Sequence, residues 1–515
     1  MLLLSSCGDW LNVVPKSDIT GEKLFDNEEG YYSALAGIYT KMISTEAYGG
    51  ALTFEHVERM GNALTSGMAG NNAEYFYDYY PQNFRYLYFF MFATSFDKRS
   101  AANSDQMEKT VTNIWTTLYN SIANANILLE ELEASGDGDF PAGVRSMLIG
   151  ETLALKAYAH FDLMRLFQPP YKSEVGKTAK RIPYMAQTTR DFVPSATSDE
   201  FLTHILADLD KAAELLKEYD PICTDKTYTT DMFAGNRQYK MNYYAVKALS
   251  ARVRLYRATA EDMQQAYDDA TEVIRAAEGG QSGIRFVTES DLTSTDSQGY
   301  VVNRAFPTEF VFALRSEQLS SQFYAVARNN SAYYGSYGYY EYLAIRNEKE
   351  AYYYPNGNDL RRKYWFSTKM QSGSRTIDKW YQPSTNASDL ALYPKQSTPM
   401  IRLGEVYLIA AEAAAELGKS DALTWLNTLQ RAHKGNEFAG TAKQEILDEI
   451  LLEYRRELLG EGQLFYAYKR RNAPKIEKGY YHGTGDVYWH TMTDKMYTMD
   501  IPLDEYNGGR TYDAL

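Results

Sequence analysis

Apolar residues recur at helical spacing along most of the chain. In residues 28–43, for example, Tyr31, Leu35, Ile38 and Met42 fall on one stripe, as they do in a helix that buries one face. The same spacing predicts helices over residues 106–133, 150–167, 199–218, 241–258, 262–277, 401–417, 420–433, 443–459 and 463–470. No comparable stretch alternates with a period of two. The pattern therefore predicts a mainly α protein.

Several of these helices carry alanine at close intervals. The positions are Ala248, Ala251, Ala266, Ala270, Ala410, Ala411, Ala414 and Ala422. Small side chains let antiparallel helices approach closely, and helical hairpins of this kind are typical of tetratricopeptide repeats. The irregular period fits a generic helical bundle equally well. Asp199 is predicted to cap the N-terminus of its helix.

Two segments interrupt the helical pattern and are rich in aromatic residues. Residues 331–342 read SAYYGSYGYYEY and hold six tyrosines, and residues 75–92, inside a loop-like zone at 61–92, hold eleven aromatic residues. Disordered segments are poor in aromatic rings, so we interpret both as ordered loops or short helices. The texture divides the chain into an N-terminal helical scaffold over 8–279, a loop-rich and tyrosine-rich region over 280–400, and C-terminal helices over 401–515.

Charge and cysteine content narrow the classes of partner. The 515 residues carry a net charge of -14, whereas nucleic acid and anionic lipid surfaces call for a basic face. Cys7 and Cys223 make no disulfide framework, and no CxxC, HExxH or EF-hand spacing offers a metal or redox site. No apolar run reaches the ~18 residues that a membrane-spanning helix needs. We therefore expect no nucleic acid, no cofactor and no metal.

Sequence signatures of catalysis are missing. The chain has no GxSxG motif, and Gly418-Lys419-Ser420 lacks the upstream glycine of a phosphate-binding loop because Ala413 stands there. The 67 acidic residues make chance carboxylate pairs plentiful, so a helical glycoside hydrolase stays open as an alternative. The expectation is that the protein is not an enzyme.

The N-terminus, MLLLSSC, resembles the end of a bacterial lipoprotein signal. Leu4-Ser5-Ser6 directly precede Cys7, as in a lipobox, where cleavage before the cysteine is followed by its acylation. We predict that residues 1–7 are a signal remnant with a lipobox and that Cys7 is lipidated. Several acyl chains would anchor the protein stably, since each buried CH₂ contributes ~0.8 kcal/mol. A chance apolar start with a free thiol is the alternative.

Several motifs occur in a fixed order along nearly the whole chain. They include CGDWLNVVPKSDIT near the start, GETLALKAYAHFDLMRLF, RLGEVYLIAAEAAAELG (402–418), EYRRELLGEGQLFYAYKRRN (453–472) and MDIPLDEYN (499–507). In these motifs the chain resembles the SusD/RagB family, surface lipoproteins of Bacteroidetes that capture nutrients beside an outer-membrane TonB-dependent transporter. Leu464 and Ala467 stand where the family often has an Arg and an Asp. Of the family's acidic run after the lipid cysteine, only Asp9 is in place.

The resemblance implies a SusD-like fold, in which tetratricopeptide-like helical hairpins form a scaffold and long loops and short helices pack over it. It implies ligand binding without catalysis or cofactor, on an exposed face built from loops in the first quarter and the middle of the chain. The implied partner is a SusC-like TonB-dependent transporter. The implied location is the cell outer membrane, with the protein lipid-anchored and facing outward.

Tyrosine suits a carbohydrate ligand because its ring stacks on the C–H groups of a sugar while its hydroxyl reaches polar partners. The predicted ligand-binding residues are Tyr333, Tyr334, Tyr337, Tyr340, Tyr77, Tyr79, Tyr80, Asn83 and Arg85. The alternative is that these rings cover the scaffold and leave their hydroxyls in solvent.

Charged residues in two motifs are predicted to be structural. In NDLRRKYWF (358–366), Asp359 is expected to pair with Arg361 and Arg362. Arg402, Glu405 and Glu412 are expected to cap and bridge neighbouring helices.

Residues and resemblance together predict cell-surface binding of an oligosaccharide or polysaccharide and its delivery to the transporter. Peptide capture by the same architecture is the nearest alternative, because some family members capture peptides and tyrosine-rich surfaces suit them. A scaffold that docks proteins through its helical hairpins, without a small ligand, is a further alternative.

Overall fold

Ten long helices predicted from apolar spacing are confirmed. The computed structural model describes residues 24–61, 65–67, 104–229, 231–235, 237–280, 282–297, 299–316, 318–327, 333–334, 337–338, 342–371, 374–381, 397–477 and 489–513. The helices are α2 (Glu28–Met42), α6 (Ser104–Ala134), α7 (Val144–Phe167), α8 (Ser198–Tyr219), α10 (Tyr243–Arg257), α11 (Ala260–Glu278), α16 (Leu403–Leu417), α17 (Ala422–Ala432), α18 (Lys443–Glu457) and α19 (Gln463–Arg470). The largest difference is at α7, which begins at Val144 rather than at 150.

Shorter elements fill the connections between these helices. The short helices are η2 (Ala51–Glu55), α3 (His56–Met60), η4 (Asp137–Asp139), α9 (Asp231–Ala234), η5 (Arg237–Tyr239), η6 (Glu289–Leu292), η7 (Pro307–Glu309), α12 (Leu319–Ala327), α13 (Asn347–Tyr353), α14 (Leu360–Tyr364) and α20 (Leu503–Asn507). The strands are β1 (Thr65–Gly67), β2 (Lys180–Pro183), β3 (Ser195–Thr197), β4 (Phe310–Arg315), β5 (Tyr333–Tyr334), β6 (Tyr337–Gly338), β7 (Tyr342–Arg346), β8 (Phe366–Gln371), β9 (Ser374–Ile377), β10 (Ser397–Arg402), β11 (Lys475–Glu477) and β12 (Trp489–Thr491). Most strands therefore fall in the region that lacks helical spacing.

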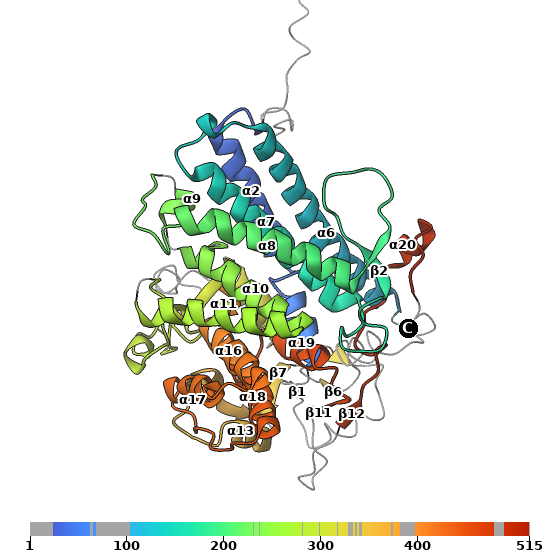
Figure 1. Ribbon diagram of the computed structural model, residues 1–515. Helices are drawn as coiled ribbons and strands as arrows, with labels where there is room; N and C mark the ends of the chain where they lie inside the picture. The colour runs from blue at the N-terminus through green and yellow to red at the C-terminus, as the bar shows by residue number, and fades with distance from the viewer. Residues whose placement is uncertain are drawn as a thin grey trace, which may run out of the picture.

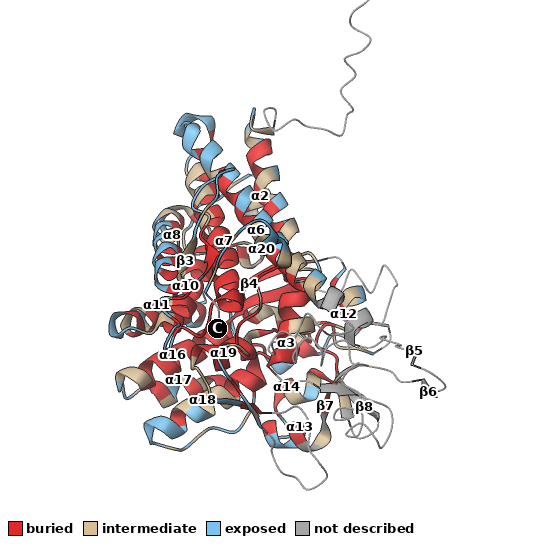
Figure 2. Ribbon diagram, turned by 90° about the vertical axis from the view of Figure 1, so that its right-hand side faces the viewer, coloured by how far each residue is buried: buried red, intermediate tan, exposed pale blue. Residues whose placement is uncertain are grey.

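The long helices stack on one another as a scaffold. Helices α10 and α11 form one hairpin and α16 and α17 another, with α11 packed against α16; Figure 1 shows them below α2, α6, α7 and α8. The alanines noted in the sequence are buried at these contacts, so the helices approach closely as predicted. In Figure 2 the buried residues run along the inner sides of the stack. Within the described ranges, no helix combines the length and apolarity needed to cross a bilayer.

The start of α8 differs from the prediction. Its N-cap is Thr197, whose hydroxyl accepts a hydrogen bond from the Glu200 N–H at 3.1 Å, while the Glu200 carboxylate accepts one from the Thr197 N–H at 2.8 Å. This capping box satisfies two backbone donors at once. The prediction of Asp199 as N-cap is therefore wrong; Asp199 instead accepts a hydrogen bond from the Tyr171 hydroxyl at 2.7 Å.

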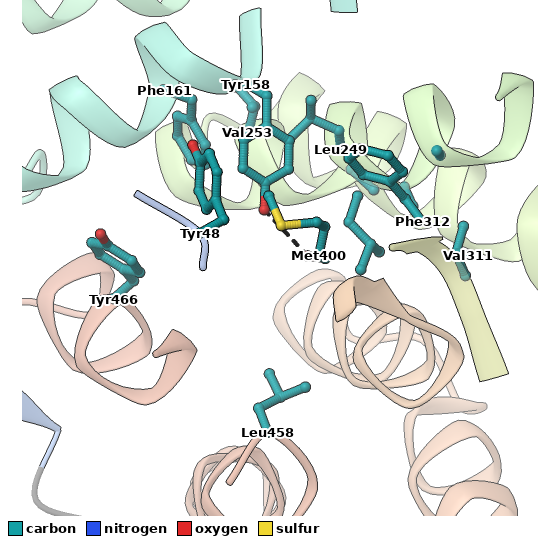
Figure 3. Close-up of a cluster of buried hydrophobic side chains, with 14 of the residues drawn as sticks. Tyr48, Tyr158, Phe161, Leu249, Val253, Val311, Phe312, Met400, Leu458 and Tyr466 are labelled. Atoms are coloured by element: carbon teal, nitrogen blue, oxygen red, sulfur yellow. Dashed lines mark hydrogen bonds between the residues drawn. The ribbon is translucent and has the colours of Figure 1, made fainter. Parts of the chain in front are cut away.

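A buried strand pair lies among the helices. Strands β4 and β10 are antiparallel, and their side chains are almost all buried. Tyr158 of α7 packs near them and donates its hydroxyl hydrogen bond to the Met400 carbonyl at 3.2 Å (Figure 3). Figure 3 also shows Tyr48 and Phe312 around the same cluster. The core thus joins the first third of the chain to its C-terminal motifs.

Candidate ligand-binding face

A four-stranded sheet joins the zone at 61–92 to the end of the second aromatic segment. Its strand order is β1-β7-β9-β8. Strand β1 lies in the zone at 61–92, ahead of its aromatic-rich residues, and β7 begins at the last residue of the second aromatic segment. The two strands pair antiparallel, with Gly67 opposite Tyr342 and Thr65 opposite Ala344. The chain therefore leaves β1 at the same end of the sheet at which it enters β7. Two segments that are far apart in the sequence are joined at one sheet edge.

The tyrosine-rich segment itself contains a short ladder. Strands β5 and β6 pair with Tyr333 opposite Gly338 and Tyr334 opposite Tyr337. The backbone thus brings together three predicted ligand residues, Tyr333, Tyr334 and Tyr337, whose side chains lie outside the described part of the structure. The other predicted site residues also lie outside it: Tyr340, Tyr77, Tyr79, Tyr80, Asn83, Arg85 and the predicted lipidation site Cys7.

A cluster of buried aromatic rings connects the segments around the four-stranded sheet. Phe54 of η2, Phe323 of α12 and Trp380, which follows β9, form a cluster with ring centroids 5.3 to 5.9 Å apart. All three side chains are buried. Such contacts between aromatic rings favour fixed relative orientations. The cluster therefore ties the segments before β1, before β5 and after β9 to one another.

A buried carboxylate fixes the elements that follow β7. Glu350 of α13 pairs with Arg362 of α14 at 2.8 Å and with Arg375 of β9 at 2.7 Å. The predicted pair between Asp359 and Arg362 is therefore wrong, because Glu350 takes that guanidinium. The predicted pair between Asp359 and Arg361 is confirmed at 2.8 Å.

Two exposed aromatic side chains, one of them on helix α13, which packs against β7, were not predicted as site residues. Tyr352 near the end of α13 is 57% exposed, and Trp489 at the start of β12 is 44% exposed. Tyr352 belongs to the run Tyr352-Tyr353-Tyr354, of which the other two are buried. The run of three tyrosines just after the predicted segment was the available signal, but identical neighbours gave no means of choosing the exposed one.

Comparison with known proteins assigns the chain to a family. Residues 9–255 match the family described as "Starch-binding associating with outer membrane", and residues 317–504 match the one described as "SusD family". The chain belongs to the SusD/RagB family.

Relatives and solved structures extend this likeness over nearly the whole chain. SusD-like protein P38 from Formosa agariphila is 22% identical over 518 residues, which cover 91% of this chain and 89% of that protein. A SusD superfamily protein from Bacteroides thetaiotaomicron has a TM-score of 0.65 at 19% identity, covering 95% of this chain and 100% of that one. Surface glycan-binding protein A from Bacteroides fluxus has a TM-score of 0.62 at 16% identity, covering 93% and 96%. The mainly α, SusD-like fold predicted from the sequence is confirmed.

Charged residues of the SusD/RagB motifs bridge helices, as predicted. Glu405 of α16 binds Arg252 of α10 at 2.6 Å, and Glu412 binds Arg470 of α19 at 2.7 Å. Arg470 and Arg471, the neighbouring cation, outweigh the effect of burial and hold the pKa of Glu412 well below its usual value. These pairs are buried and hold the helices of the SusD scaffold in fixed relative positions.

One group of described residues in this SusD/RagB protein has the composition of a metal site. Ligand atoms of Glu309, His433 and Glu457 all lie within 4.8 Å of one another. His433 Nε2 is 2.8 Å from Glu309 and Nδ1 is 3.2 Å from Glu457, and Arg402 contacts both carboxylates at 2.9 and 2.7 Å. Burial favours a neutral imidazole, but the two carboxylates outweigh it and raise the pKa of His433 to about 9. Together with Arg402, the three side chains form a buried cluster of ion pairs.

A cavity lies at the opposite end of the SusD scaffold from the sheet. It has a volume of about 1160 Å³ and is lined by the start of α2, the connection between α6 and α7, and residues 227–232. Figure 1 places these elements at the top of the molecule, with β1 and β7 near the bottom. The cavity is thus separate from the face that unites the aromatic segments.

Proposed function

We propose that this protein binds an oligosaccharide or polysaccharide at the cell surface through the face formed by the β1–β7 sheet and the tyrosine-rich ladder. Aromatic rings stack on sugar rings, and tyrosine hydroxyls bind the sugar hydroxyls at the rim. The bound glycan is then delivered to a TonB-dependent transporter in the outer membrane. Binding of modest strength suits this role, because the ligand has to be released.

The pairing of β1 with β7 carries this proposal. Gly67 lies opposite Tyr342, so the sheet joins the zone at 61–92, whose later part is rich in aromatic residues, to the end of the tyrosine-rich segment. Sugar stacking gives a physical reason for tyrosine in these segments. Family membership and a structural neighbour named as a surface glycan-binding protein support the same ligand class.

The test is a glycan-binding measurement on a variant of the tyrosine-rich ladder. Tyr333, Tyr334, Tyr337 and Tyr340 are changed together to Ala. The unmodified protein is first screened by affinity electrophoresis against starch, xylan, laminarin and pectin. Calorimetry on the polysaccharide that binds should show affinity lowered by about tenfold or more in the variant, since each stacked ring contributes ~0.5–1.5 kcal/mol.

A matched control removes an exposed tyrosine from another part of the molecule. Tyr506 of α20 is 44% exposed, and Tyr506→Ala should bind glycan like the unmodified protein. Circular dichroism checks that both variants keep their helices. Undiminished binding by the fourfold variant would show that the ladder is not part of the binding site. Binding of peptides from a library, without binding of any glycan, would favour peptide capture.

Anchoring, partner and lack of catalysis are further parts of the proposal. Acylation of Cys7 would hold the protein at the outer membrane, and Cys7→Ser should abolish incorporation of labelled palmitate. Co-purification from solubilised membranes should recover a TonB-dependent transporter. Prolonged incubation with the bound polysaccharide should release no new reducing ends, and their appearance would indicate a glycoside hydrolase.

A further inference from the structure

The two exposed aromatic residues are connected through two buried residues. Tyr352 packs its ring 5.3 Å from the ring of Tyr353, centroid to centroid. The Tyr353 hydroxyl donates a hydrogen bond to Glu477 at 2.7 Å, and Glu477 of β11 lies directly opposite Trp489 of β12. A single buried tyrosine and a single carboxylate therefore separate the two exposed rings. Tyr352 and Trp489 are called the α13–β12 platform below.

Buried ion pairs hold the base of this platform in place. Glu477 pairs with Lys349 of α13 at 3.0 Å and with Arg455 of α18 at 3.6 Å. All three side chains are buried. Helix α13 is held on its other side by the pairs of Glu350 with Arg362 and Arg375. The platform is thus fixed by the scaffold before any ligand arrives, which lowers the ordering cost of binding.

The chemistry of the platform favours a polar polymer. The Lys475 ammonium lies 4.4 Å from the centroid of the Trp489 ring. An exposed aromatic ring and a hydrogen-bond donor are therefore adjacent. Among the described residues, the hydroxyl of Tyr353 and the carboxylate of Glu477 lie between the two rings. Each ring is suited to one sugar of a chain, with polar contacts between them.

The platform follows the tyrosine-rich ladder along the chain. Strand β7 begins four residues after β6, and helix α13 begins directly after β7 and packs against it. A five-residue strand spans about 16 Å, and β7 has five residues, Tyr342–Arg346. We expect a short oligosaccharide bound at the ladder to end before α13, and a longer chain to reach Tyr352 and Trp489.

We propose that the α13–β12 platform is an outlying subsite that stacks sugar rings of a long glycan chain and gives the protein a preference for chain length. The inference rests on the proposed function, because it needs a glycan at the neighbouring face. It adds two binding residues, Tyr352 and Trp489, and a reason for their exposure.

The test compares short and long fragments of the same glycan. The probes are the trisaccharide and decasaccharide fractions of whichever of starch, xylan, laminarin or pectin the unmodified protein binds. In the double variant Tyr352→Ala/Trp489→Ala, the decasaccharide should bind about tenfold more weakly. The trisaccharide should bind as it does to the unmodified protein. Because both rings are exposed, the variant should keep its thermal unfolding midpoint.

A matched control is an exposed aromatic ring beside a cation elsewhere. Phe192 is 65% exposed and has the Arg510 guanidinium 4.9 Å from its ring, as Trp489 has Lys475. Phe192→Ala should leave the affinity for both fractions unchanged.

The outcomes separate this inference from the proposed function. Unchanged decasaccharide binding by the double variant, or equal weakening for both fractions, would overturn the outlying subsite while the glycan function stands. Binding of peptides but of no glycan at the platform would also overturn it. If none of the four polysaccharides slows the unmodified protein in affinity electrophoresis, and the fourfold ladder variant migrates like the unmodified protein, the proposed function itself fails.

Discussion

The tyrosines of the helical scaffold and the tyrosine of the α13–β12 platform have opposite surroundings. In the scaffold, the Tyr39 hydroxyl donates to Glu151 at 2.6 Å, and the Tyr48 hydroxyl donates to Asp162 at 2.7 Å. Both rings are buried. At the platform, Tyr352 is 57% exposed and rests its ring against the buried ring of Tyr353. One residue type thus stabilises the core in one region and forms a solvent-facing surface in another.

The difference shows what the high tyrosine content means. Burial, together with the charge of Glu151, raises the pKa of Tyr39 well above its usual value, so its hydroxyl stays a hydrogen-bond donor at any physiological pH. A buried hydroxyl of this kind orients a carboxylate that would otherwise be costly to bury. Many of the 45 tyrosines are therefore explained by the scaffold, and only exposed ones are candidates for ligand contact.

The largest expected effect comes from removing the cation at the centre of the scaffold. Arg402 is fully buried and pairs with Glu309, Glu457 and Glu461. Arg402→Met should lower the free energy of unfolding by about 3–5 kcal/mol, because it leaves carboxylates buried without their partner. Urea denaturation followed by circular dichroism measures this change.

An exposed ion pair provides the control for this substitution. Arg431 and Glu437 lie 3.1 Å apart with side chains 60% and 49% exposed. Pairs exposed to this extent contribute about 0–1 kcal/mol, so Arg431→Met should barely move the unfolding midpoint. Equal effects of the two substitutions would contradict the structural role assigned to the buried network.

His433 is expected to give the scaffold a dependence on pH. Its pKa is raised to about 9 in the folded protein by Glu309 and Glu457, from 6.5 when unperturbed. Its contribution to stability is therefore complete below pH 6.5 and is lost as pH rises through 9. A shift of this size corresponds to on the order of 3 kcal/mol.

The measurement is the difference in unfolding free energy between the unmodified protein and His433→Gln from pH 6 to 10. The difference is needed because Lys379, whose pKa burial lowers to about 8, titrates in the same range. The unmodified protein should be more stable at pH 6, and the gap should close towards pH 10. A gap that stays constant across this range would show that His433 carries no charge in the fold.

The helical scaffold was largely predictable from the sequence because its signal is local. Leu35, Ile38 and Met42 recur at helical spacing, and all are buried as predicted. The capping box of α8 was also readable, since Thr197 and Glu200 stand at the required spacing. The pair between Arg362 and Glu350 was not, because its partner comes from another element and is chosen only by tertiary packing.

The sequence indicated the candidate face through its aromatic-rich segments, but it did not indicate which residues of the face are exposed. No local pattern indicates that β1 pairs with β7, since that contact joins segments distant in the sequence. Tyr352, Tyr353 and Tyr354 are indistinguishable in the sequence. In the fold, the Tyr353 hydroxyl donates a hydrogen bond to Glu477 at 2.7 Å, and the Tyr354 hydroxyl donates one to the Arg456 carbonyl at 2.8 Å. Tyr352 is left exposed because the helix turns it away from both acceptors.

The smallest substitutions that separate the structural from the ligand-binding role of tyrosine remove a single hydroxyl, from Tyr39 in the scaffold or from Tyr352 at the platform. Tyr39→Phe should lower the free energy of unfolding by about 1.5–3 kcal/mol, since it deletes a buried hydrogen bond to a charged group. It also removes the acceptor of the Met241 N–H at 2.8 Å. Tyr352→Phe should leave the unfolding free energy unchanged, and it should lower decasaccharide affinity less than Tyr352→Ala because the stacking ring remains. Denaturation and calorimetry on the two variants measure both quantities. A loss of stability in Tyr352→Phe would show that the Tyr352 hydroxyl stabilises the fold. A loss of affinity equal to that of Tyr352→Ala would show that the platform binds sugar by hydrogen bonding and not by stacking.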